Sequence, residues 1–350
     1  MMVPGNSIPS PQIGFAPGND IGQQELPLPD HGREGGILRF PWGALLILSG
    51  ILTLGATFAE IASTELVYPS RHWTAWQIHS NGAPNSRTYE QLDGVALVVS
   101  GVLIVVAGLL AILVRVGDRR SAPTVAAVAS GLSVGVTATT MFAAESYGSS
   151  SAHPLARHAG YWLLLAAALV AATAMAIGIT AKVGRLGTVR DRYAAIVFAG
   201  VLLLASAIAA IGSVPDQWQD PPAAGMTKRL SLSAWHLDYS SATSGRTDPV
   251  ELGVPLLLAA FLGILCAGLL LTPIALRTGF VRTASASAAG LIFGVTLTVV
   301  LDTTSHEFLN GGDVGSLRSG AWMLMVAAAL SAIAIGLVLW LPSRPRPEAT

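Results

Sequence analysis

Long apolar runs alternate with short polar segments along most of this chain. Each run reaches the roughly 17–25 residues that a helix needs to cross a bilayer. This pattern predicts an all-α polytopic membrane protein with eight transmembrane helices. The eight windows contain no Asp, Glu, Lys or Arg and fall at about 41–59, 94–114, 122–144, 159–181, 193–214, 252–276, 283–301 and 319–342.

One nine-residue pattern, G-L-x-x-G-V-T-x-T, occurs in the third window and again in the seventh. It begins at Gly131 and at Gly290, which are 159 residues apart. Residues four apart share a helix face, and small residues on such a face let two backbones approach closely. The alternative is that both helices line a permeation path. We expect close helix packing by six residues: Gly131, Gly135, Thr139, Gly290, Gly294 and Thr298.

A second match at the same offset lies in the polar segments before the second and sixth windows. Trp76 in residues 60–93 corresponds to Trp235 in residues 215–251. Apolar and polar residues alternate around both tryptophans, which is typical of half-buried strands. We therefore expect small β-structured outer loops that cap each half of the chain. Large apolar rings need a partner surface, so both tryptophans should be substantially buried or should contact a partner protein.

Further matches place the two halves in the same order. The second and sixth windows share A-G-L-L, and the segments that follow share R-x-G-x-x-R. An even number of helices in each unit keeps both copies parallel, about an axis along the membrane normal. We therefore divide the chain into a disordered cytoplasmic tail (1–38), two four-helix membrane repeats (39–181 and 182–342) and a cytoplasmic C-terminal tail (343–350).

Charge is balanced overall but is uneven along the chain. Only 11% of residues are charged, against roughly 25% in soluble proteins. If the N-terminus is cytoplasmic, the cytoplasmic segments, including the loop 277–282 that ends at Arg282, hold most of the basic residues. The positive-inside rule then predicts a plasma-membrane protein with both termini in the cytoplasm. The excess of arginine over lysine and the abundant alanine suggest a bacterial source. One cysteine, Cys266, allows no internal disulfide.

Acidic residues fall near the predicted outer helix ends. Asp302 lies four residues after Thr298 and shares its face. Asp93 and Glu251 come directly before the second and sixth windows, where they could place one acid from each half around the axis. Carboxylates at the membrane surface cost little, whereas ion routes place them inside the membrane. We therefore expect solvated helix ends and an ordinary negative outer face.

The third window also carries a polar stripe on one helix face. Its residues could line a pore, but most of their counterparts in the seventh window are apolar. Hydroxyl side chains in apolar helices usually bond to their own backbone, and we expect this here. The stripe consists of Ser130, Ser133, Thr137 and Thr140.

Most histidines fall in predicted outer segments. They could bind a metal or sense external pH, but none has the close spacing of ligands on a helix. We expect solvated loop residues and no metal site. These histidines are His72, His79, His153, His158, His236 and His306.

No nucleophile motif, phosphate-binding loop or cysteine pair is present. The sequence therefore favours a non-enzymatic protein without a cofactor, an accessory or scaffold subunit of a cell-envelope assembly. It would contact membrane lipid, and it would bind an envelope protein through its outer loops. The net charge of zero gives no reason to propose nucleic-acid binding. The alternative is a permease or channel for a small solute at the interface of the repeats. A membrane enzyme acting on lipid is the weakest option. An open polar cavity between the halves would favour the permease. A closed contact packed through glycines would favour the scaffold.

Overall fold

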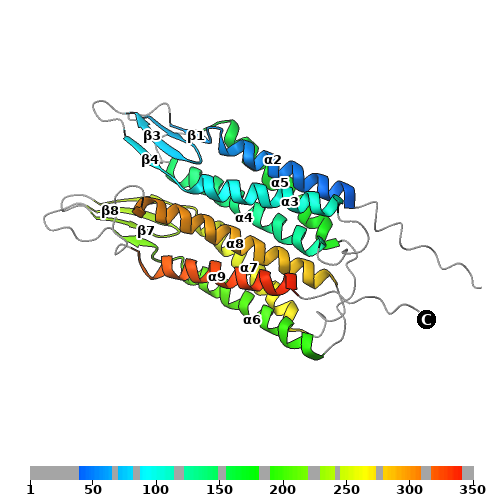
Figure 1. The fold of residues 1–350 in the computed structure, drawn as a ribbon. Coiled ribbons are helices and arrows are strands. Elements are labelled where there is room, and N and C mark those ends of the chain that lie inside the picture. Colours follow the sequence, from blue (N-terminus) through cyan, green and yellow to red (C-terminus); the bar gives the residue numbers. More distant parts are fainter. Residues whose placement is uncertain are drawn as a thin grey trace, which may run out of the picture.

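The structure, a computed structural model, describes residues 39–64, 70–81, 87–113, 122–148, 155–180, 190–219, 229–240, 245–272, 279–308 and 317–340. In this part of the chain, a bundle of long helices carries two small β-sheets at one end (Figure 1). Both predicted tails lie outside the described residues. The helices are α2 (Arg39–Thr57), α3 (Asp93–Leu113), α4 (Ala122–Gly148), α5 (Ala159–Thr180), α6 (Arg190–Gly212), α7 (Gly253–Leu271), α8 (Gly279–Phe308) and α9 (Ser319–Trp340).

Among the described residues, seven helices are long and apolar enough to cross a membrane. α2 contributes a shorter apolar stretch, Pro41–Thr57. Large apolar side chains on the outside of α3 and α7, such as Leu103 and Phe261, are exposed on the bundle, as suits contact with lipid tails. The prediction of a helical, multi-pass membrane protein is confirmed at this level. Its division into eight crossings and two repeats stays a prediction.

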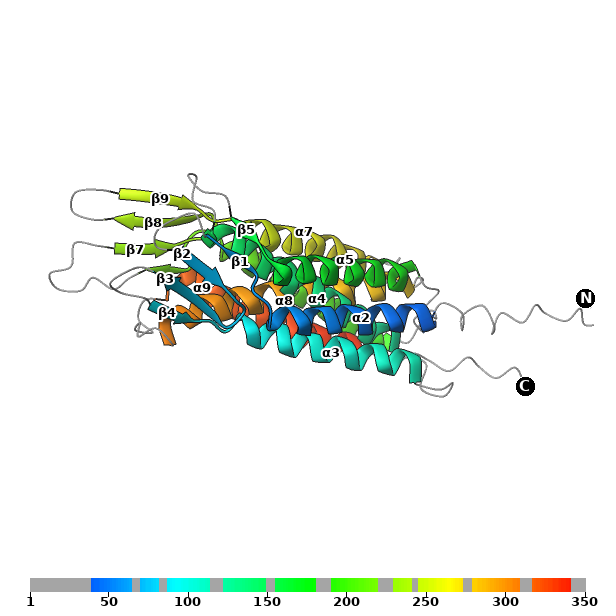
Figure 2. The same cartoon turned by 90° about the horizontal axis from the view of Figure 1, so that it is seen from above.

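The helices pack as two four-helix groups (Figures 1 and 2). In the first group α2 packs on α3 and α5 and α4 completes the set; in the second α6 packs on α7 and α9 and α8 completes it. The most extensive contact between the groups joins α4 and α8. These two are also the most buried, because 67% of the membrane window of α4 and 72% of that of α8 lie inside the bundle, against at most 44% elsewhere. They form its centre.

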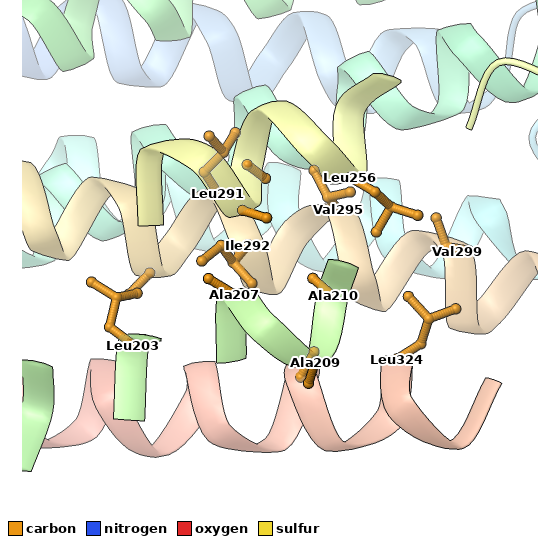
Figure 3. Close-up of a cluster of buried hydrophobic side chains, with 14 of the residues drawn as sticks. Leu203, Ala207, Ala209, Ala210, Leu256, Leu291, Ile292, Val295, Val299 and Leu324 are labelled. Atoms are coloured by element: carbon orange, nitrogen blue, oxygen red, sulfur yellow. The ribbon is translucent and has the colours of Figure 1, made fainter. Parts of the chain in front are cut away.

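Small and aliphatic side chains fill the space around α8. Figure 3 shows Ala207 of α6 beside Ile292 of α8, and Leu324 of α9 directed towards Val299 of α8. Alanine at the facing positions lets the helices approach, and the larger residues fill the remaining gaps. The core of the second group is therefore apolar along the length shown.

Each group carries an antiparallel sheet at the same end of the bundle. The first has the order β4-β3-β2-β1-β5 and the second the order β6-β7-β8-β9. The predicted β structure in the loops is present, since alternating residues form the hairpins β2–β3 and β7–β8. The strands are β1 (Ala62–Ser63), β2 (Ser70–Trp73), β3 (Gln77–Asn81), β4 (Arg87–Glu90), β5 (Ala156–Arg157), β6 (Trp218–Gln219), β7 (Arg229–Leu232), β8 (His236–Ser240) and β9 (Gly245–Pro249).

The two central helices extend beyond the charge-free windows. α8 covers Gly279–Phe308, whereas the sequence window covers only 283–301. Arg282 therefore lies in a helix rather than in a loop, and the expectation that it belongs to a solvated inner segment is wrong. It is 3% exposed, and its guanidinium donates to the carbonyl of Val338 on α9 at 3.2 Å. A charged residue can extend a buried helix where a neighbouring backbone accepts its hydrogen bonds.

Candidate functional site at the helix seam and the sheet end of the bundle

The glycines of the two nine-residue patterns meet where α4 contacts α8, a contact that we call the seam. A side chain on Gly131 would collide with the carbonyl oxygen of Ser287, and one on Gly290 with that of Val128. These contacts are reciprocal, because Val128 and Ser287 are separated by the same 159 residues as the glycines. Each helix thus places its glycine against the backbone of the other.

The second glycine of each pattern repeats this arrangement one turn along. A Cβ atom at Gly135 would lie 2.6 Å from the carbonyl oxygen of Leu291, and one at Gly294 would lie 2.6 Å from that of Leu132. Real Cβ atoms essentially never come within 3.0 Å of such a neighbour, and a helix carbonyl cannot turn aside. Any larger residue would separate the two helices. At these glycines the backbones of α4 and α8 are in direct contact, and no open space remains between the two groups there.

The threonines of the pattern bond within their own helices. Thr139 donates to the carbonyl of Gly135 at 2.7 Å, and Thr298 donates to that of Gly294 at 2.9 Å. Both threonines are fully buried. Their hydroxyls are therefore satisfied beside the seam without bridging it.

The polar stripe of α4 is also satisfied inside the bundle. Ser130, Thr137 and Thr140 donate to carbonyls of their own helix, at 2.7–3.0 Å. Ser133 lies 3.2 Å from the hydroxyl of Ser49 on α2. All of the stripe is at most 2% exposed, so these hydroxyls do not face an open pore.

The two tryptophans of the outer loops occupy matching hairpin turns. The ring of Trp76 lies against Gly94 at the start of α3, and the ring of Trp235 lies against Gly253 at the start of α7. The backbone bonds that fix each glycine to its turn are 2.7 and 2.8 Å long. Burial is only partial, because Trp76 keeps 37% of its surface exposed and Trp235 is half-buried. The expectation of substantial burial therefore fails for the outer part of Trp76.

Two acids expected at solvated helix ends are instead buried. Asp93 is 3% exposed at the start of α3 and Asp302 is 2% exposed on α8. They are close enough to interact electrostatically across the two groups. Leu301 packs against the apolar cluster that contains Leu97 of α3, which fits this proximity. The interpretation of Asp93 and Asp302 as solvated residues is wrong. Glu251 is exposed, as expected for a residue of an ordinary negative outer face.

A small pocket lies beside Asp93, between the β2–β3 turn and the sheet ends of α3 and α4. It has room for about one water molecule. Asp93 Oδ1 and Trp73 Nε1 are buried without a hydrogen-bond partner, and both residues line this pocket. We call it the acidic pocket; its polar lining comes from Trp73, Thr74, Gln91, Asp93 and Thr140.

The positions displaced by 159 residues in the second group carry a different distribution of polar residues. Four polar lining positions become aliphatic there, whereas Ala143 and Ala144 of the pocket correspond to Asp302 and Thr303. Four buried aliphatic residues there belong to one apolar cluster, together with Ala143 of α4, which corresponds to Asp302. The polar residues Trp73, Gln91, Asp93 and Thr140 are thus replaced by Leu232, Val250, Leu252 and Val299.

Two histidines anchor the first sheet rather than standing free in solvent. His72 Nδ1 lies 2.7 Å from Glu60 Oε1. His158 Nε2 lies 2.7 Å from Ser63 Oγ and 3.8 Å from Glu60 Oε1. The expectation of solvated residues is therefore wrong for His72 and His158, while His153 lies outside the described residues. In the described ranges no group of three or more His, Cys, Asp or Glu is placed to hold a metal ion.

An ion pair joins α4 to the strand that follows it. Arg157 Nε donates to Glu145 Oε1 at 2.7 Å. This bond raises the pKa of Arg157 above its ordinary value. Glu145 is thereby occupied at the surface of the bundle.

Sequence reasoning missed the acidic pocket although its signal is in the chain. Comparison of positions 159 residues apart sets Gln91 against Val250 and Asp93 against Leu252. A polar residue in one copy opposite an aliphatic residue in the other marks a place where the surroundings differ. Matched positions identify the repeat, and these mismatched positions identify residues of the pocket.

Comparison of the chain with protein-family models, with curated proteins and with solved structures finds no match in any of the three. The function is therefore argued from the geometry alone.

Proposed function

We propose that this chain is a non-enzymatic accessory or scaffold subunit of a bacterial cell-envelope assembly. In this proposal the chain crosses the plasma membrane eight times, as two repeats of a four-helix unit, with both termini in the cytoplasm. The sheets then lie outside the membrane and offer a surface to an envelope protein, while α3 and α7 contact lipid.

The seam is the observation that carries this proposal. A permease that works at the interface of two repeats needs the repeats to separate or to leave a polar path between them. Here Gly135 and Gly294 bring the two backbones into direct contact, with hypothetical Cβ atoms 2.6 Å from the opposite carbonyl oxygens. Contact of this kind stabilises helix association in lipid through van der Waals packing. It favours one permanent unit over two moving halves.

The sheets support a role in partner binding. Trp76 keeps 37% of its surface exposed in a hairpin whose backbone is fixed to α3 by hydrogen bonds. A large aromatic residue on a rigid support is a common anchor at protein interfaces. Trp235 stands in the equivalent turn on α7 and would supply a second contact.

Copurification tests this proposal. The full chain would be purified in mild detergent from its own cells, and proteins bound in fixed ratio would be measured by mass spectrometry. We expect Trp76→Ala to lower the yield of one partner by about tenfold, the loss that a single interface anchor commonly causes. Trp162→Ala is the matched control, because Trp162 is a 56% exposed tryptophan in the first turn of α5, outside the two hairpin turns. An equal loss in both variants, or no partner in fixed ratio, would contradict the proposal.

A second candidate, the permease for a small solute, is favoured by one observation. Buried acids within membrane helices commonly mark ion routes, and Asp93 and Asp302 are 3% and 2% exposed. This candidate predicts solute uptake by the purified protein in lipid vesicles, lost in Asp93→Asn. The scaffold predicts no uptake by either form.

A further inference from the structure

Two histidines stand opposite each other on one face of the first sheet. His72 of β2 pairs with His79 of β3 in the antiparallel register. The Cβ atoms of residues paired in this way lie roughly 4.5–5.5 Å apart, so both imidazole rings can reach a common point above the sheet. Side chains alternate between the faces of a strand, which puts the neighbouring Trp73 and Ile78 on the opposite face.

The face with the histidines is directed away from the helices. On the other face Trp73 is 3% exposed, and Ile78 packs against the apolar cluster of the first group. His79 is exposed, and the side chain of His72 keeps 32% of its surface. An ion in solution therefore has access to both rings.

Each ring is held by a hydrogen bond at one of its two nitrogens. His72 Nδ1 lies 2.7 Å from Glu60 Oε1, and His79 Nδ1 lies 2.9 Å from Thr88 Oγ1. The two bonds hold the pair from opposite sides, since Glu60 precedes β1 and Thr88 belongs to β4. Among the described residues, Nε2 of either ring makes no hydrogen bond.

Metal-binding histidines are commonly held in this way. A histidine ligand donates one ring N–H to a carboxylate or another acceptor, which fixes the ring and leaves its other nitrogen for the metal. Glu60 and Thr88 supply such acceptors. The carboxylate of Glu60 also places a negative charge beside the pair, which favours a cation. Imidazole nitrogen suits Zn²⁺, Cu²⁺ and Ni²⁺, whereas Mg²⁺ and Ca²⁺ prefer oxygen.

We propose that His72 and His79 bind one divalent transition-metal ion of the zinc and copper class, through Nε2 of each ring. The described ranges gather no third histidine, cysteine or acid for such an ion, so the chain supplies two ligands and water completes the coordination. Positions filled by water leave the ion open to exchange and to a further ligand. This site goes beyond the scaffold role and depends on neither Trp76 nor Trp235.

The second sheet offers no such pair. Its strands β7 and β8 pair in the same register, but Ser231 and Asp238 occupy the corresponding positions. Thr247 donates to Asp238 Oδ1 at 2.7 Å, as the counterpart of the bond between His79 and Thr88. One exposed histidine of β8, His236, lies opposite Pro249. It has no second imidazole across from it and therefore provides a control.

Calorimetric titration of zinc chloride into the full chain in detergent tests the site. The protein carries no polyhistidine tag, and magnesium chloride is the control for binding to carboxylates. We expect the wild type to bind zinc and not magnesium at this site. His79→Gln should weaken zinc binding by at least about tenfold, because losing a group that merely orients a ligand already costs about 10–100-fold.

Two further variants complete the series. His72→Gln should weaken zinc binding as His79→Gln does, because either change leaves one imidazole. His236→Gln is the matched control and should bind zinc as the wild type does, since it removes an exposed histidine from the second sheet. The unfolding temperature of each variant in EDTA shows whether it is folded.

A wild type that binds no zinc overturns the proposal, and this result does not depend on whether any variant folds. Equal zinc affinity in the wild type and in folded His79→Gln overturns it too, as does an equal loss in His236→Gln. None of these results bears on copurification, so the metal site and the scaffold proposal fail separately.

Discussion

The acidic pocket of the first group and the corresponding place in the second share one backbone design and differ in chemistry. In both, a tryptophan in a hairpin turn lies on a glycine in the first turn of the next helix. Beneath the turn the first group has Asp93 and Gln91, and the second has Leu252 and Val250. The second group thus serves as an internal control, because it shows which features of the first are needed for folding.

This comparison separates packing from function within one molecule. The reciprocal contacts of Gly131 and Gly290 are matched in the two groups, as packing constraints would be. The acids are not matched, since Ala143 takes the place of Asp302. Matched features therefore report on the framework, whereas the unmatched polar residues Asp93, Gln91 and Asp302 are not part of what the two groups share.

The largest expected effect comes from exchanging residues between the two places. Leu252→Asp should lower the free energy of unfolding by about 3–5 kcal/mol, because it buries a carboxylate without a compensating charge. Asp93→Leu should change it by about 1 kcal/mol or less, since removing a buried charge offsets a small misfit. Thermal unfolding in choline chloride at neutral pH measures both. Equal losses would mean that Asp93 has a structural role.

A smaller effect should follow from disturbing the tryptophan contacts. Gly94→Ala and Gly253→Ala each place a methyl group against an indole ring, and each should cost about 1–3 kcal/mol through overpacking. Gly336→Ala is the control, because no atom lies within 4 Å of its added methyl group. It should be neutral or stabilising by about 0.5–1 kcal/mol. A large difference between the first two variants would break the equivalence of the turns.

The smallest effect should come from two serines in equivalent helix contacts. Ser49 donates to the carbonyl of Ala167 at 3.0 Å, and Ser206 donates to that of Ala327 at 2.8 Å. Replacing either serine with alanine should cost about 0.5–1.5 kcal/mol. Ser49→Ala should cost more, because Ser49 also contacts the hydroxyl of Ser133. Chemical denaturation in detergent can rank them, and a greater loss in Ser206→Ala would contradict this account.

Much of the framework could be predicted from the sequence because membrane helices and matched motifs leave strong signals. Charge-free windows gave the helices, and alternating residues around Trp76 and Trp235 gave the sheets. Helix ends were less predictable, since a window without charges stops at the first charged residue. α8 continues past Asp302 to Phe308 and begins before Arg282. Arg282 and Asp302 therefore lie in the buried part of α8, and no pattern in the neighbouring residues predicts this extension.

Mismatches between the two halves mark residues of the acidic pocket in the sequence, but the geometry of the pocket could not be predicted because it depends on contacts between distant segments. Trp73 lies in a strand, Asp93 begins a helix and Asp302 belongs to the other group. Only the packing of α3 on α4 and α8 brings them near one another. The burial of Trp76 was overestimated for a related reason. Gly94 covers one face of its ring, but no other described segment covers the rest, and 37% of the residue stays exposed.

The central claim is that direct backbone contact at the seam holds the two groups together. It is tested most directly by the unfolding temperature of the double variant Gly135→Leu, Gly294→Leu, beside Gly268→Leu. Each seam substitution should cost about 1–3 kcal/mol, because leucine must force the helices apart. Gly268→Leu should leave the unfolding temperature almost unchanged, since Gly268 is exposed and nothing lies within 4 Å of a Cβ atom added there. An unfolding temperature of the double variant equal to that of the wild type would contradict the claim, because the seam glycines would then face open space.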